Sequence, residues 1–382
     1  MAKFYQLLLL LLTTVSLHAQ VIRETIESNS LDSNRNLKIQ LPRNYNPKAE
    51  RAYPLIVVLD GDYLFEPVAG NVDFNAYWED VPDCIIVGVE QDLFKAKDFS
   101  FDEETNDLTA DGLAFYNFID KELIAFMDRN YKTSSYRVVV GHDLSANFMN
   151  YFLAVKQPIF RAFVALSPDL SPKVSEQLPQ WLLSLEKESF YYLVTAEADI
   201  KAQRNKIIEC DSKLKTITNA KLNYKFKNFE DANHYSLVGR GIPKALAHIF
   251  ALYKPISRSE YKEKLLNAED SPYNYLINKY EAIKHFYGFK KRLIENDIRA
   301  VAVASKKKND TNSLENLALL IKKEFPNSML GAYYMGMFYE EIGDYKKALL
   351  QYKSGLLYEP SQYIDKEIML DKMYEAQDTL GN

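Results

Sequence analysis

The feature that most constrains this chain is a series of short apolar runs that alternate with amphipathic helical patterns. The runs that resemble strands lie at residues 21–27, 37–41, 53–59, 84–89, 136–140, 160–166, 190–194 and 222–226. Helical patterns lie at residues 112–131, 144–155, 201–216 and 242–253. Most of the runs lack the polar alternation of a half-exposed strand, which is typical of a parallel sheet covered on both faces. Residues 21–256 are therefore expected to form a doubly wound α/β domain with a mainly parallel sheet.

The strand patterns stop after Ser257, and residues 257–382 are expected to form an all-α domain. Pro326 and Pro360 are 34 residues apart, which is the period of tetratricopeptide repeats. The segment 329–362 resembles one such repeat through Gly336, Tyr339, Gly343, Tyr345, Ala348, Tyr352 and Pro360. Repeats of this kind bind partners rather than perform chemistry, so a protein partner is expected here. A plain helical bundle is the alternative.

Residues 1–20 have the pattern of a secretory signal peptide. Lys3 supplies the positive start, an apolar stretch runs from Leu7 to about Leu17, and Ala19 offers a small residue before the cleavage site. The stretch is shorter than the roughly 20 residues that cross a bilayer, and no later segment is apolar enough to do so. The protein is therefore expected to be exported, periplasmic or secreted, without a membrane span; a membrane anchor is the alternative.

Composition excludes several classes of function. The 47 basic and 52 acidic side chains are well mixed and give a net charge of −5, so nucleic acid is not an expected partner. The chain has only 13 glycines and no phosphate-binding glycine motif, so no cofactor is implied. Cys84 and Cys210 make neither a disulfide framework nor a zinc site, and Cys84 is expected to be a small buried hydrophobe.

Polar residues that carry chemistry follow three of the predicted strands. His142 and Asp143 lie between the strand at 136–140 and a helix, where a sharp turn is expected. Glu197 and Asp199 follow a later strand, and His234 follows the last one. The carboxyl ends of parallel strands meet at one edge of a sheet, where ligands bind. The chain order of elbow, acid and histidine is that of α/β-hydrolases.

The chain resembles the putative esterase family, which includes S-formylglutathione hydrolases, ferric-enterobactin esterases and feruloyl esterases. The resemblance covers about residues 21–253 and is carried, beyond the elbow, by the segments 58–62, 86–89, 118–123, 128–131 and 160–168. It implies an α/β-hydrolase fold, an ester-like small-molecule ligand and His234 as the general base or its relic. It also implies an oxyanion-hole region at Gly61, Asp62 and Leu144.

Glu197 and Asp199 compete for the role of the acid. We favour Asp199, because Ala196 followed three residues later by Asp199 resembles the small-residue-then-acid turn of the family. His142 is interpreted as structural rather than catalytic.

The departure from the family lies at the elbow itself. The family pattern is Gly-His-Ser-x-Gly-Gly, whereas this chain has Asp143 in place of the serine and Ser145 and Ala146 in place of the two glycines. A serine hydroxyl that attacks an ester gives an acyl-enzyme, whereas a carboxylate would give a mixed anhydride and is a weaker nucleophile. The ordinary esterase mechanism is therefore not available through position 143.

Four hypotheses for this site remain open. The favoured one is a catalytically degenerate esterase that serves in binding or assembly. Displacement at saturated carbon by Asp143 is a second hypothesis, with Trp78 as a candidate for holding the leaving group. A third is a metal site of Asp143, His234 and one of Glu197 or Asp199. The fourth is residual ester hydrolysis by Ser145 or by water activated by His234. A plain ion pair between Asp143 and His234 would raise the pKa of the histidine and disable it as a base.

Overall fold

The computed structural model describes residues 21–43, 45–48 and 50–381, so the predicted signal peptide at 1–20 lies outside the described residues. Contacts divide the chain into two compact units, Met1–Ile249 and Phe250–Asn382, which we call the sheet unit and the helical unit. This division precedes the predicted boundary at residue 256 by a few residues. The reason is that Tyr253 and Ile256 bond within the helical unit, to Lys291 Nζ and Asp297 Oδ1. None of the described helices is both long and apolar enough to cross a bilayer.

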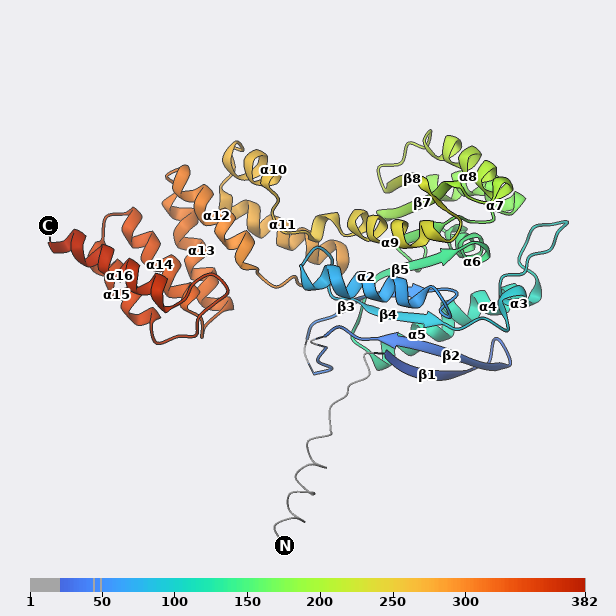
Figure 1. Ribbon diagram of the computed structural model, residues 1–382, viewed down its shortest axis with the longest axis horizontal. Helices are drawn as coiled ribbons and strands as arrows, with labels where there is room; N and C mark the ends of the chain where they lie inside the picture. Colours follow the sequence, from blue (N-terminus) through green and yellow to red (C-terminus); the bar gives the residue numbers. More distant parts are fainter. Residues whose placement is uncertain (1–20, 44, 49, 382) are drawn as a thin grey trace, which may run out of the picture. The chain divides into compact units, whose positions relative to one another are not determined.

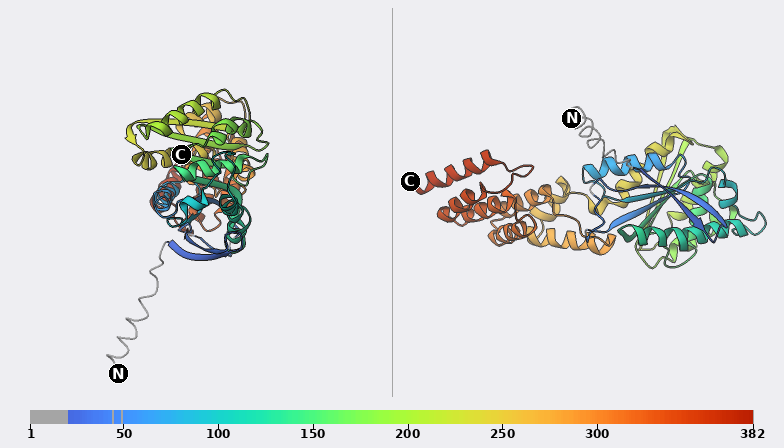
Figure 2. Two further views of the ribbon diagram at one scale, coloured as in Figure 1. Left: turned by 90° about the vertical axis from the view of Figure 1, so that its right-hand side faces the viewer. Right: turned by 90° about the horizontal axis from the view of Figure 1, so that it is seen from below.

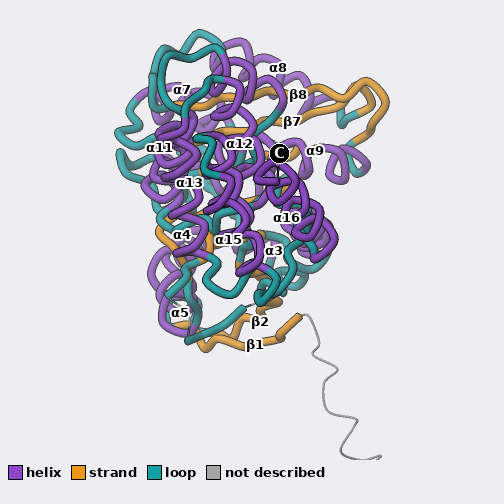
Figure 3. The backbone as a smooth tube through the Cα atoms, turned by 90° about the vertical axis from the view of Figure 1, so that its left-hand side faces the viewer, coloured by secondary structure: helices purple, strands orange, loops and turns teal. Residues whose placement is uncertain are grey.

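An eight-stranded sheet forms the centre of the sheet unit (Figure 1). Its strands are β1 (Val21–Ser28), β2 (Ser33–Gln40), β3 (Tyr53–Val58), β4 (Ile85–Val89), β5 (Thr133–His142), β6 (Ala162–Leu166), β7 (Ser189–Ala198) and β8 (Leu222–Asn233). Across the sheet the order is β1-β2-β4-β3-β5-β6-β7-β8, with β1 and β2 at one end and β7 and β8 at the other (Figure 3). β2 pairs antiparallel with β1 and β4, and all the other pairs are parallel. This is the mainly parallel sheet that the sequence predicts.

Helices cover both faces of the sheet, which explains why its central strands lack polar alternation (Figure 2). Helices α2 (Phe65–Tyr77) and α9 (Ser236–Ile249) pack together on one face. Helices α4 (Ala110–Asn117) and α5 (Ile124–Asn130) lie on the other face. There, Leu55 and Val57 of β3 join one core with Phe115 and Phe118.

The structure differs from the predicted elements in several places. The predicted helix at 144–155 is an α-helix over Leu144–Phe148 followed by a 3₁₀ helix over Met149–Leu153, and the short helix Lys95–Asp98 is not among the predicted elements. Helix α2 was not predicted, because its exposed aromatic residues Phe74 and Tyr77 obscure the helical period. Helix α7 (Pro172–Leu183) was missed because Pro172 begins it and Pro179 lies inside it. The predicted helix at 112–131 is interrupted by a π-helical turn, η1 (Phe118–Leu123), between α4 and α5.

The helical unit consists of successive helices that pack against their chain neighbours. They are α10 (Arg258–Glu260), η4 (Tyr261–Leu266), α11 (Pro272–Tyr287), α12 (Glu295–Lys307), α13 (Thr311–Glu324), α14 (Met329–Glu341), α15 (Tyr345–Gly355) and α16 (Lys366–Gly381). Helices α14 and α15 fill the segment 329–362, and Gly336 lies so close to the ring of Tyr352 that any Cβ would overlap it. The small residue at 336 is thus required by packing, while the assignment to tetratricopeptide repeats stays a prediction.

The junction between β5 and helix α6 (Leu144–Phe148) places the candidate site. Asp143 has a left-handed backbone, with φ 61° and ψ −120°, so the chain reverses sharply from strand to helix. A Cβ at Gly141 would lie 2.7 Å from the Ala146 nitrogen and 2.8 Å from the Ser145 carbonyl oxygen. Glycine at 141 therefore allows the helix to approach the end of the strand.

We predict that Gly141→Ala lowers the free energy of unfolding by about 1–3 kcal/mol, because the added methyl overlaps backbone atoms that cannot move without shifting α6. Gly70→Ala is the matched control. Gly70 lies within α2 and has no atom within 4 Å of its added Cβ, so alanine there should stabilise the helix by about 0.5–1 kcal/mol. Urea unfolding of both variants measures the difference. Equal stability of Gly141→Ala and wild type would contradict the assigned role of Gly141.

Candidate active site

The buried carboxylate of Asp199 organises the candidate site. His234 Nδ1 lies 2.9 Å from Asp199 Oδ1, and the Ile200 N–H donates to the same oxygen at 2.8 Å. The hydroxyls of Ser167 and Thr195 both donate to Asp199 Oδ2 at 2.7 Å. The ends of β6, β7 and β8 therefore converge on one carboxylate.

These bonds determine the protonation of the pair. Burial raises the pKa of Asp199, but hydrogen bonds from His234, Thr195, Ser167 and Ile200 outweigh it and lower the pKa to about 2. An ionised carboxylate only accepts hydrogen bonds, so His234 Nδ1 carries a proton. Its Nε2 is then the ring nitrogen available to act as a base.

Glu197, the competing acid, lies outside this arrangement. Its side chain is exposed and accepts hydrogen bonds from Arg204 at 2.7 Å and Asn228 at 2.5 Å, which lower its pKa. A register irregularity in β7 between Ala196 and Ala198 lies where the chain turns toward Asp199. The structure therefore brings Asp199, and not Glu197, to His234.

Asp143 occupies the elbow at the end of β5, and its side chain is half-buried. Gln203, in the first turn of α8 (Lys201–Leu214), donates from Nε2 to Asp143 Oδ1 at 2.7 Å. Among the described residues, no hydrogen bond or ion pair joins Asp143 to His234, whose carboxylate partner is Asp199. Sequence reasoning gave no role to Gln203 or Ser167, because only the meeting of separate elements reveals their contacts.

Both ring nitrogens of His142 have hydrogen-bond partners within the protein, so neither is free for a ligand. Its Nε2 lies 3.1 Å from the His234 carbonyl oxygen, so this nitrogen donates. The Tyr63 hydroxyl lies 3.0 Å from His142 Nδ1 and 3.3 Å from Asp60 Oδ2. Lys95 Nζ forms an ion pair with Asp60 at 3.1 Å. With both ring nitrogens engaged, the geometry of His142 is that of a structural residue.

The three residues of the predicted oxyanion-hole region differ in what they offer. The Gly61 N–H donates to the Val89 carbonyl at 2.8 Å, so it is already used. The Asp62 side chain accepts from the backbone N–H groups of Gln91 and Asp92 and thereby shapes the loop after β4. Leu144 is the first residue of α6, and an N–H at that position has no partner within its helix. Of the three, only the Gly61 N–H is thus shown to be used within the sheet unit, and the Leu144 N–H has no partner within its helix.

Ser145 is not placed to act as a nucleophile. Its side chain is fully buried, accepts from the His142 N–H at 2.9 Å and donates to the His142 carbonyl at 2.9 Å. The hydroxyl therefore closes the turn of the elbow. Hydrolysis that begins at Ser145 does not fit this arrangement.

Two further expectations for the site also fail on geometry. Trp78 follows the last residue of α2 and is 63% exposed. Helix α2 begins near the carboxyl end of β3 and has 13 residues, which places Trp78 about 20 Å farther along its axis. Among the described residues, no group of three or more His, Cys, Asp or Glu side chains is arranged to hold a metal ion. The side chains proposed for a metal site are instead bonded to Gln203, Arg204 and Ser167.

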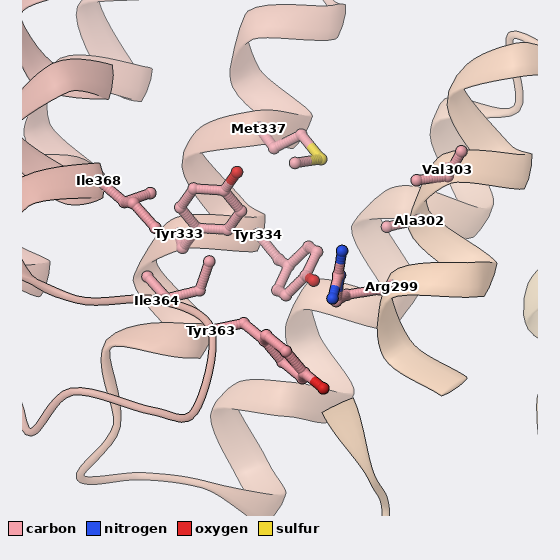
Figure 4. A pocket seen from close by; sticks show the side chains of 9 residues that line it. All are labelled: Arg299, Ala302, Val303, Tyr333, Tyr334, Met337, Tyr363, Ile364 and Ile368. Carbon is pink, nitrogen blue, oxygen red and sulfur yellow. The ribbon is translucent and has the colours of Figure 1, made fainter. Parts of the chain in front are cut away.

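A concave feature lies within the helical unit (Figure 4). It is a groove of about 260 Å³, lined by Arg299, Ala302, Val303, Tyr333, Tyr334, Met337, Tyr363, Ile364 and Ile368. The Arg299 guanidinium lies 4.5 Å from the centre of the Tyr363 ring. The lining is therefore mostly aromatic and aliphatic, with one cationic group.

The comparisons agree with this architecture. A family model described as "Putative esterase" matches residues 28–224, just over half of the chain. The chain belongs to the putative esterase family. An uncharacterised protein from Capnocytophaga ochracea DSM 7271 is 28% identical with a TM-score of 0.80, and the match covers 94% of this chain and 100% of that one. The similarity to that protein therefore extends into the helical unit.

Two other solved structures share the fold at lower identity. An IroE-like serine hydrolase from Shewanella oneidensis is 20% identical with a TM-score of 0.62, covering 79% of this chain and 99% of that one. The BES protein from Bacillus cereus is 23% identical with a TM-score of 0.53, covering 61% and 96%. No curated protein matches the chain. The α/β-hydrolase fold expected from the resemblance is thus confirmed.

The environment of His142 predicts a pH dependence of stability. Burial, together with the neighbouring His234 ring, lowers the pKa of His142 from 6.5 to about 4. As the pH falls below 6.5, the unfolded chain binds this proton before the folded chain does, so stability decreases. The loss between pH 7 and pH 4.5 should be about 2–3 kcal/mol, and His142→Gln should remove it.

Urea unfolding at pH 7, 5.5 and 4.5 measures this loss. His285→Gln is the control, because His285 is an exposed histidine near the end of α11. The control should keep the pH dependence of the wild type. A His142→Gln variant that loses stability as steeply as the wild type would show that His142 does not stay neutral in the folded protein.

Proposed function

We propose that this member of the esterase family binds a small ligand at its elbow and does not hydrolyse esters. One observation carries the proposal: the elbow position holds a carboxylate that Gln203 binds at 2.7 Å. The two serine hydroxyls nearby are both buried and engaged, Ser145 with the His142 backbone and Ser167 with Asp199. No hydroxyl among these is free to form an acyl-enzyme.

The chemistry of a carboxylate supports the same proposal. Attack of Asp143 on an ester carbonyl would expel an alkoxide, which is a much poorer leaving group than the carboxylate itself. The tetrahedral intermediate would therefore return to the starting ester rather than proceed to an anhydride. Replacement of the serine thus removes turnover while it keeps the carboxyl end of the sheet as a binding site.

We further propose that the protein is exported and that its helical unit binds a protein partner. The pattern of residues 1–20 supports export. The groove lined by Tyr333, Tyr334 and Tyr363 supports partner binding, because aromatic side chains around a single guanidinium are typical of interaction surfaces.

An assay with p-nitrophenyl acetate tests the loss of ester hydrolysis. The wild type should hydrolyse the ester no faster than His234→Ala does. Asp143→Ser should raise kcat/KM by at least tenfold, because it restores a hydroxyl beside an intact histidine–carboxylate pair. Wild-type turnover well above that of His234→Ala would refute the proposal.

The restored variant also provides matched controls for the two acids. In the Asp143→Ser background, Asp199→Asn should abolish the gain, because His234 would lose the acceptor that orients it. Glu197→Gln should leave the gain intact, because Glu197 bonds only to Arg204 and Asn228 at the surface.

A second candidate function is displacement at saturated carbon, and the intact pair of Asp199 and His234 favours it. An Asp143 oxygen would attack the carbon of a haloalkane, and the halide would leave with the bonding electrons. Water would then attack the carbonyl carbon of the resulting ester while His234 Nε2 takes its proton. His234 would return that proton to the departing alkoxide, which leaves as the alcohol, and the Asp143 carboxyl would lose the second water proton to solvent and return to a carboxylate.

Trapping of the covalent intermediate tests this second candidate. His234→Gln should retain the first step and lose the hydrolysis of the ester, so incubation with 1-chlorobutane should add one butyl group to Asp143. Peptide mass spectrometry detects the addition, and His234→Gln/Asp143→Asn is the control. An unmodified Asp143 in His234→Gln, together with an absence of chloride release by the wild type, would exclude displacement chemistry with this substrate.

A further inference from the structure

The side chain of Gln203 contains a buried acceptor atom that no described residue satisfies. Gln203 is 6% exposed, and its Oε1 receives no hydrogen bond. Its Nε2 donates to Asp143 Oδ1 at 2.7 Å. A buried amide oxygen without a donor is costly, and this one lies beside the elbow.

The orientation of this amide follows from its neighbour. A carboxylate oxygen accepts hydrogen bonds, so the NH₂ group of Gln203 faces Asp143 Oδ1. The carbonyl of the amide is then fixed on the adjacent side. Asp143 Oδ2 likewise takes no hydrogen bond from a described residue, so the elbow presents two acceptors next to each other.

The charge at the elbow is also uncompensated. No described Lys, Arg or His side chain forms an ion pair with Asp143. Three cations of the surrounding elements are paired with other carboxylates, namely Lys95 with Asp60, Lys206 with Asp169 and Arg204 with Glu197. Lys201, at the start of α8, is exposed and forms no ion pair with Asp143. A half-buried carboxylate without a cation attracts a positively charged ligand.

Exposed aromatic rings lie beside both histidines of the site. Tyr63 is 45% exposed and packs edge-on against His142, with ring centres 5.9 Å apart, but Lys95 Nζ already lies over its ring, 5.5 Å from the centre. Tyr235 is 78% exposed and packs edge-on against His234 at 5.1 Å. Aromatic faces favour organic cations.

We propose that the elbow site binds the primary ammonium group of an organic amine. One N–H donates to Asp143 Oδ2 and another to Gln203 Oε1, while the organic part lies against the exposed ring of Tyr235. This proposal rests on the proposed binding function and names its ligand class: replacement of serine by aspartate changes the site from one that attacks a carbonyl to one that accepts donors.

Calorimetric titration of the full chain with butylammonium chloride tests the proposal. 1-Butanol and sodium butyrate serve as probes of equal size without the positive charge. The wild type should bind butylammonium and neither of the other two. Asp143→Asn should weaken binding by about tenfold or more, since it removes the charge with little change of shape. Gln203→Met should weaken it by several-fold, and Gln180→Met, an exposed glutamine on α7, should not.

Four outcomes would overturn the proposal. The first three are an absence of butylammonium binding at concentrations on the order of 10 mM, binding of 1-butanol as tight as that of butylammonium, and an affinity of Asp143→Asn for butylammonium equal to that of the wild type. A fourth is tighter, Asp143-dependent binding of magnesium or calcium chloride, which would make the elbow an inorganic cation site. Circular dichroism confirms the folding of each variant, and two independent substitutions keep the test valid if one fails to fold.

The two proposals can fail separately. A wild type that hydrolyses p-nitrophenyl acetate refutes the proposed function, whatever it binds. If the wild type neither hydrolyses the ester nor binds butylammonium, only the proposed ligand class is refuted.

Discussion

The rest of the site depends on the burial of the Asp199 carboxylate. A charge removed from water must be compensated by hydrogen bonds, and here four donors supply them: His234, Ser167, Thr195 and the Ile200 backbone. Those donors come from the ends of β6, β7 and β8 and the loops that follow them. One anion therefore holds three strand ends in register and orients the histidine.

From His234, a series of hydrogen bonds extends toward the other half of the sheet. The His234 carbonyl accepts from His142, whose second nitrogen bonds to Tyr63, and Tyr63 also lies beside Asp60. The Asp60 N–H donates to Gln91, and Gln91 donates to Asp98, which forms a buried ion pair with Arg35. A continuous series of polar contacts thus runs beneath the elbow from β8 to β2. The buried carboxylates of Asp60 and Asp98 have raised pKa values because burial outweighs their cationic partners.

Three of the seven described non-glycine residues with positive φ lie at the same edge of the sheet. Asp60, Asp143 and Ser167 follow or end β3, β5 and β6, and all three have positive φ, at 53°, 61° and 42°. Glycine adopts this conformation most readily, yet the chain uses aspartate and serine, whose side chains bond locally or into the site. Such strain persists only where the surroundings enforce it, and it is typical of functional sites. The glycine-poor composition is therefore compatible with a sharply turned elbow, and the polar side chains at these turns form the site.

The sequence by itself determined the α/β architecture, the chain order of Asp143, Asp199 and His234, and the loss of the serine, because periodicity and motif spacing are local properties. It left Glu197 and Asp199 as alternatives, since both follow the same strand within three residues. Only the tertiary structure decided between them, by the irregularity in β7 and by hydroxyls from β6 and β7 that reach Asp199 alone. The contact of Gln203 with Asp143, the burial of Ser145 and the remoteness of Trp78 were likewise beyond the sequence. Each depends on how elements far apart in the chain pack together, and a local pattern of residues contains no information about such packing.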